Sequence, residues 1–91
     1  VSSSYRLEDR YVSYKVYDPE YVGDDAGIVV IDITVNKSGD VKKTSVNAAT
    51  TITNEEVIEA ARKAALKTDF NYNSDAPETQ SGTITFTYYK K

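Results

Sequence analysis

Residues 27–41 read GIVVIDITVNKSGDV, and this stretch decides the fold. Alternate residues from Val29 onward are apolar, which is the period-two pattern of a strand with one face on the core. The residues between them change from apolar to polar, so the second face is only partly covered. The run NKSGD at 36–40 supplies turn chemistry, with Gly39 expected at positive φ. Val41–Ala48 is predicted to return as the second strand of a hairpin.

A helical pattern follows in residues 54–71, NEEVIEAARKAALKTDFN. Thr53 and Glu56 fit a capping box, in which the threonine hydroxyl accepts a bond from a helical N–H and Glu56 reaches back. The predicted helix runs from about Asn54 to Thr68, and Phe70 seals the core after it. Its apolar side, rich in alanine, allows close approach to a sheet and comprises Val57, Ile58, Ala60, Ala61, Ala64, Ala65 and Thr68.

Thr83–Tyr89 is predicted as the last strand, with Ile84, Phe86 and Tyr88 on one face. The helix crosses from the second strand to the last, which then lies antiparallel beside the first. We therefore expect an α+β fold: a three-stranded antiparallel sheet in the order second–first–last, with one helix on one face. An additional N-terminal strand is left open. The last strand is expected at a sheet edge, where its outer N–H and C=O groups are unpaired.

The N-terminal segment is harder to place. Residues 1–4 form a polar end, whereas YVSYKVY at 11–17 has the composition of a short strand. We expect Tyr11–Tyr17 to pair with a sheet edge, with the second strand as the first candidate, or with a partner molecule. Residues 1–18 are thus an N-terminal extension, and residues 19–91 are the domain. An open alternative is that the N-terminal segment covers the edge of the last strand.

Composition limits the function. Ninety-one residues make one small domain, and the net charge of −3 with a pI near 4.8 argues against nucleic acid as a partner. Cysteine is absent, which excludes disulfides and thiolate metal sites. No apolar run reaches the ~18 residues of a membrane span. The chain begins at Val1 without an initiator Met, so we expect an excised domain or a mature product with any membrane anchor upstream.

Catalysis is not expected. The chain has no His and no Cys, so it lacks the commonest general base and the best nucleophile. The carboxylates of Glu55, Glu56 and Glu59 suit the first turns of a helix. Asp24 and Asp25 with their acidic neighbours do not have the spacing of an EF-hand and fit a solvated loop better than a Ca²⁺ site. We expect a non-enzyme without cofactor or metal.

The ordered set of motifs resembles the C-terminal domain of TonB-type energy transducers. The matching features are a glycine that opens the first strand, a Ser-Gly-Asp-Val turn, an alanine-rich helix before Phe-Asn, and a glycine-led last strand. The closest subgroup has the motif Ala-Pro-x-x-Gln-x-Gly-Thr-Ile. The matching residues are Gly27, Ser38 to Val41, Glu59 to Ala65, Phe70-Asn71, Ala76-Pro77, Gln80 to Phe86 and, upstream, Pro19-Glu20-Tyr21.

Two features depart from the family. Its better-known members place a short helix between the proline and the first strand, and the connection from Tyr21 to Gly27 is too short for one. The proline-rich spacer and the membrane helix of the family are also missing from this sequence.

The resemblance implies a periplasmic domain, anchored to the inner membrane in the full-length protein. It implies capture of the N-terminal extended motif of an outer-membrane transporter by strand addition, to drive substrate uptake. Inner-membrane proton-channel partners would be reached only through the missing N-terminus. Lys90 and Lys91 would favour acidic residues in the captured segment. The predicted partner-binding residues are Gly82, Thr83, Ile84, Thr85, Phe86, Thr87, Tyr88 and Tyr89, with Pro19 and Tyr21 as the far wall of the groove.

Two other functions fit the same domain type. One is a sensory or regulatory module appended to a membrane protein or lipoprotein. The other is a self-assembling module, a homodimer in which edge strands of two copies pair.

Overall fold

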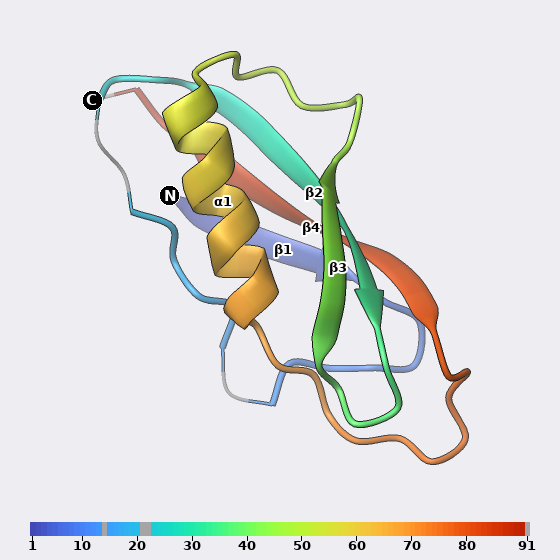
Figure 1. Cartoon of the computed structure of the whole chain (residues 1–91). Coiled ribbons are helices and arrows are strands. Elements are labelled where there is room, and N and C mark those ends of the chain that lie inside the picture. Colours follow the sequence, from blue (N-terminus) through green and yellow to red (C-terminus); the bar gives the residue numbers. More distant parts are fainter. Residues whose placement is uncertain (14, 21–22, 91) are drawn as a thin grey trace.

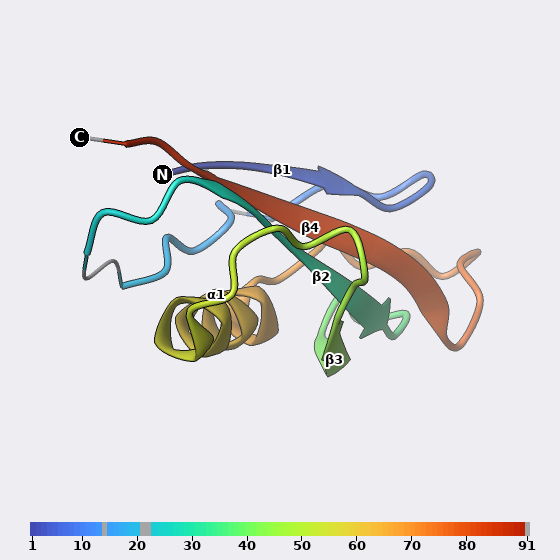
Figure 2. The ribbon, with the colours of Figure 1, turned by 90° about the horizontal axis from the view of Figure 1, so that it is seen from above.

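The computed structural model describes residues 1–13, 15–20 and 23–90. Its elements, in chain order, are β1 (Ser2–Arg6), β2 (Gly27–Val35), β3 (Val41–Val46), α1 (Glu55–Lys67) and β4 (Gln80–Tyr88). The strands form one antiparallel sheet in the order β1-β4-β2-β3. Helix α1 lies across one face of this sheet (Figures 1 and 2), and the opposite face is called the open face below.

The centre of the fold agrees with the sequence analysis. Strand β2 lies between β3 and β4, which is the predicted order second–first–last. The β2 face toward α1 is fully buried, with Val29, Ile31 and Val35 at 0% exposure. On α1, Ala61 and Ala65 are also buried, so the alanine face lets the helix lie directly on this sheet. The fold is a small α+β fold, as predicted.

Gly39 takes the predicted positive φ, at 95°. The segment after α1 crosses the turn at this point, because the Phe70 N–H donates to the Gly39 carbonyl over 2.8 Å. A Cβ on Gly39 would lie 1.8 Å from the carbonyl oxygen of Phe70. Both the backbone conformation and the close crossing therefore require glycine.

Helix α1 starts one residue later than the capping box predicted. The N-cap is Asn54, whose side chain accepts a hydrogen bond from the Glu56 N–H over 3.0 Å, and not Thr53. Asparagine is at least as good an N-cap as threonine, so the capping-box motif did not determine which of these two neighbouring residues is the N-cap. The helix ends at Lys67, and the buried Thr68 hydroxyl that follows donates to the Ala64 carbonyl over 3.0 Å.

The sheet has a fourth, N-terminal strand in addition to the three expected ones, and the prediction that the last strand lies at an edge is wrong. Strand β1 pairs with β4 from Ser2 opposite Thr87 to Arg6 opposite Thr83, so β4 is paired on both sides. The alternative in which the N-terminal segment covers this edge is the one found. Residues 1–4 gave no strand signal because serine lacks both β propensity and an apolar alternation.

Tyr11–Tyr17 does not form the predicted strand. Val12 makes an isolated bridge to Phe70, and the Ser13 N–H donates to the Asp69 carbonyl over 2.9 Å. The segment thus runs beside residues 69–71, just after α1, and not along a sheet edge. Val12 and Val16 pack against the core, which accounts for the apolar residues that looked like a strand. Tyr14 lies outside the described residues.

We predict that Ile31→Ala or Ile33→Ala lowers the free energy of unfolding by ~2–5 kcal/mol, because each leaves a cavity under α1. Urea denaturation measures the change. Thr34→Ala is the matched control, since Thr34 lies on the same strand but points to the open face and is only half-buried. Equal losses for Ile33→Ala and Thr34→Ala would contradict the placement of the core.

Candidate partner-binding surface

The predicted capture strand is a strand, but it is not an edge. Ile84, Phe86 and Tyr88 of β4 point toward α1 and are buried. The alternating residues Thr83, Thr85 and Thr87 are half-buried on the open face. Gly82 lies early in β4, and Tyr89 is exposed just after it. The structure therefore brings these eight residues together, with β1 covering their outer side.

Strand β1 contributes few side-chain contacts to the sheet that it joins. All five of its residues are exposed. The Tyr5 ring packs edge-on against Phe70 with ring centroids 5.4 Å apart, and the Ser2 hydroxyl lies 2.9 Å from the Tyr89 hydroxyl. Pairing of β1 with β4 is therefore mainly a main-chain interaction.

Firm anchoring begins directly after β1. Leu7 is buried at 5% exposure and Arg10 at 6%. A turn joins them, in which the Arg10 N–H donates to the Leu7 carbonyl over 3.2 Å and Asp9 has a φ of 58°. Leu7 belongs to the hydrophobic core. Residues 7–10 thus fix the chain immediately behind a weakly held strand.

The Arg10 guanidinium ties three segments together. It donates to the Asn71 carbonyl over 2.6 and 3.1 Å, to the Asn36 carbonyl over 3.0 Å and to Gln80 Oε1 over 3.1 Å. These acceptors belong to the segment after α1, the β2–β3 turn and the start of β4. Sequence reasoning missed Arg10, because a single arginine in a polar segment carries no pattern that marks it as buried.

Gly82 marks the point where β4 passes closest to the end of β1. A Cβ on Gly82 would lie 2.4 Å from the Arg6 carbonyl oxygen and 2.7 Å from Leu7 Cδ1. Nearby, Gln80 Nε2 donates to the Glu8 carbonyl over 2.6 Å. The glycine that leads the last strand therefore serves the close packing of residues 6 and 7.

Pro19 does not lie on the capture strand. It is buried and lines a groove of about 650 Å³ between residues 17–20 and one flank of α1. No residue of β4 lines this groove, so the groove at Pro19 does not include the predicted capture strand. Tyr21, the other residue of that wall, lies outside the described residues.

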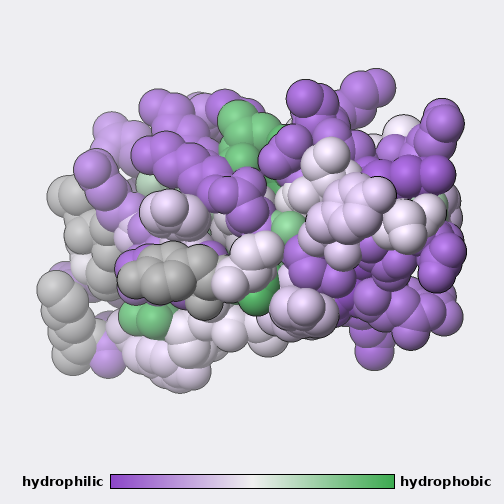
Figure 3. Space-filling model, turned by 90° about the horizontal axis from the view of Figure 1, so that it is seen from below, coloured by the Kyte–Doolittle hydropathy of each residue, from purple (hydrophilic) through white to green (hydrophobic). Residues whose placement is uncertain are grey.

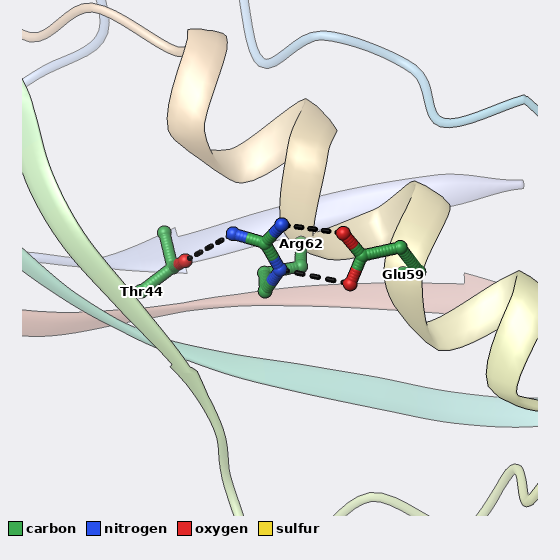
Figure 4. Close-up of polar contacts among 3 residues, drawn as sticks. All are labelled: Thr44, Glu59 and Arg62. Atoms are coloured by element: carbon green, nitrogen blue, oxygen red, sulfur yellow. Dashed lines mark hydrogen bonds and ion pairs between the residues drawn. The ribbon is translucent and has the colours of Figure 1, made fainter.

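The second outer strand of the sheet, β3, is protected. Lys42 and Lys43 are both exposed on it, and exposed lysines on an edge strand oppose pairing with another chain. From α1, Arg62 Nη1 donates to the Thr44 hydroxyl over 3.3 Å, which ties the helix to this strand (Figure 4). The β1 edge carries no lysine or proline.

Arg62 also pairs with Glu59 one turn earlier on α1. Arg62 Nε donates to Glu59 Oε2 over 2.9 Å, and Nη2 donates to Oε1 (Figure 4). The hydrogen bond from Arg62 lowers the pKa of Glu59, and the same bond raises the pKa of Arg62. Both groups are on the surface, so this pair supports the helix and is not a perturbed catalytic group.

The described surface shows no other strong site. No group of three His, Cys, Asp or Glu residues within residues 1–13, 15–20 and 23–90 is placed to hold a metal ion. In the same ranges, no helix has the length and apolar character to cross a membrane. The face seen from below Figure 1 is mostly hydrophilic, with hydrophobic surface in small separate areas (Figure 3).

Comparison of the chain with protein-family models, with curated proteins and with solved structures finds no significant match. The resemblance to the TonB family therefore stays a prediction from the sequence motifs.

We predict that Arg10→Met lowers the free energy of unfolding by ~2–3 kcal/mol, because several part-buried carbonyl groups lose their charged donor. Arg10→Lys should lower the free energy of unfolding by an intermediate amount. Its ammonium group keeps the charge but lacks the planar guanidinium fork that reaches acceptors on three segments. Chemical denaturation of both variants is the measurement. A loss within about 0.5 kcal/mol for Arg10→Met, the range of an ordinary surface substitution, would contradict the assigned role.

We predict that Arg62→Gln raises the pKa of Glu59 toward its ordinary value, because the Arg62 bond that lowers it is lost. Titration of the Glu59 carboxyl by NMR measures this, with Lys63→Gln as a control that should shift it less. A lowered folded-state pKa stabilises the fold above the unfolded pKa. This contribution is lost as the pH falls through the folded pKa. Arg62→Gln should therefore flatten the acid side of the stability profile slightly.

Proposed function

We propose that this chain is a protein-binding domain that takes an extended segment of another protein into its sheet. The observation that carries the proposal is strand β1 itself. It is remote from β4 in sequence, it pairs over five residues, and all of its side chains are exposed. These are the properties of a peptide bound by strand addition. The β1–β4 side of the sheet therefore suits an added strand, whereas β3 carries two lysines.

We further propose that the domain belongs to a TonB-like energy transducer in the periplasm. Its partner is then the N-terminal extended motif of an outer-membrane transporter, bound beside Gly82–Tyr88. Support for this narrower reading comes from the sequence motifs alone. A sensory or regulatory module would use the same binding side without transmitting force.

Self-assembly is the second candidate. Strand β1 ends the sheet, so its outer main-chain groups face away from β4. Two copies could pair through these edges and form one continuous sheet. A molecular mass that rises to that of a dimer with concentration, measured by sedimentation, would favour this candidate.

We predict that peptides from transporter N-terminal segments bind the chain with an about micromolar dissociation constant, because ordering the peptide offsets much of the main-chain bonding. Titration of isotope-labelled protein followed by NMR should shift amides of residues 2–6 and 80–88. Added salt should weaken the binding of peptides whose acidic residues reach Lys90, because it screens the attraction between the charges.

The control is the same peptide with a central proline, which cannot donate to the ladder. Proline is placed in the peptide because β4 is paired on both sides, so proline in β4 would break the fold itself. Equal binding of both peptides, or shifts confined to the groove beside α1, would refute strand addition.

A further inference from the structure

We propose that the partner segment takes the place of β1 on β4, with apolar side chains at the two positions that Ser3 and Tyr5 now fill. This inference rests on the proposed function. It assigns the side-chain pattern of the partner segment and identifies β1 as the strand with which that segment competes. The occupant is an extended segment of a different protein.

Strand β1 can leave without unfolding the rest of the domain. Its five side chains are exposed, whereas Leu7 and Arg10 behind it are buried. The turn from Leu7 to Arg10 and the hydrogen bonds of the Arg10 guanidinium do not involve β1. Departure of residues 1–6 therefore breaks the β1–β4 pairing, the Tyr5–Phe70 contact and the hydroxyl contacts of Ser2 with Tyr89 and of Tyr5 with the Val12 N–H. It leaves the turn from Leu7 to Arg10 in place.

The register defines what an incoming strand meets. Ser3 lies opposite Phe86 and Tyr5 opposite Ile84, and both partners are buried residues on the α1 side. Directly opposite residues of an antiparallel pair share a face, so positions 3 and 5 point toward α1. The contact of Tyr5 with the core residue Phe70 agrees with this direction. Positions 2, 4 and 6 lie over Thr87, Thr85 and Thr83 on the open face.

The native strand fits this edge incompletely. Tyr5 supplies an aromatic ring at one inward position, but Ser3 puts an exposed hydroxyl beside Phe86 at the other. A β-branched apolar residue in place of Ser3 would form an apolar cross-strand pair with Phe86. A partner with that residue and an aromatic residue two positions later would therefore compete with β1.

Addition outside β1 offers no comparable selection. A strand there would lie beside β1, whose Ser2, Ser3 and Ser4 side chains are small and present no apolar surface, so Tyr5 is the one large apolar side chain of β1 that it would meet. Displacement therefore gives the partner two apolar positions on β4, opposite Phe86 and Ile84, whereas outside addition offers only Tyr5 in addition to main-chain bonds.

The test uses the full chain and three synthetic peptides of residues 1–8: the native VSSSYRLE, one with Ser3→Val and one with Ser4→Val. The two variants have the same composition, but their valine faces opposite sides of the sheet. We expect the Ser3→Val peptide to bind about 3-fold more tightly than the Ser4→Val peptide. On binding, the amides of Ser2–Arg6 that are hydrogen-bonded to β4 should lose protection from hydrogen exchange, while the amide of Arg10, which donates to the Leu7 carbonyl, keeps its protection.

Matched variants of the protein test the competition. Ser3→Val in the chain should improve β1 and weaken binding of the Ser3→Val peptide about 3-fold, and Ser4→Val in the chain should not. Along an edge strand, N–H groups point alternately toward the neighbouring strand and away from it. One of Ser3→Pro and Ser4→Pro therefore removes an N–H that is bonded to β4, and the other removes an N–H that points away from the sheet. The variant that loses a bond to β4 should bind the peptide about 10-fold more tightly, because its weakened β1 is the intramolecular competitor of the peptide.

Four results would overturn the inference. Binding with residues 2–6 still protected means addition outside β1, and the proposed function would survive. Equal binding of the Ser3→Val and Ser4→Val peptides would refute the side-chain pattern. A dimer in which copies exchange β1 would make the occupant a second copy. If neither these peptides nor transporter segments shift β1 or β4 at all, the proposed function fails as well.

Discussion

The structure depends on burial of one face of β2 beneath α1. Val29, Ile31, Ile33 and Val35 form this face, and among the described strands none has a longer buried apolar row. The small side chains of α1 bring the helix close enough to cover it, and β4 adds its own inward row beside β2. Burial of this kind is the main favourable term in folding, so the remaining parts are placed relative to this layer.

The sequence predicted this layer because its signals are periodic. A two-residue period in β2 and β4 and a helical period in α1 identify the inward faces, and Gly39 identifies the turn. The same reasoning failed for β1, since a serine-rich strand that pairs through its main chain has no side-chain period to detect. Tyr11–Tyr17 misled in the opposite way. Its apolar residues pack against the core from an irregular segment.

Periodicity also explains why the candidate site was predicted only in part. Residues 82–88 were correctly placed on one strand, but strand order depends on what lies beside that strand. Arg10 could not be found from sequence, because its role comes from three carbonyl-bearing segments that meet only in the fold. Pro19 and β4 were grouped by motif, and the groove at Pro19 does not include β4.

The chain enters the sheet at the start of β1 and leaves it at the end of β4, and these two points lie at the same corner. This arrangement has a mechanical consequence. Ser2 lies opposite Thr87, and its hydroxyl contacts that of Tyr89, so both termini leave from the same end of the β1–β4 pair (Figure 1). Tension between the two ends would load these hydrogen bonds one after another, starting at Ser2, and would unzip β1 toward Arg6. A pair loaded along its strands would share the force among all bonds at once. This corner is therefore where the domain yields first under a pull.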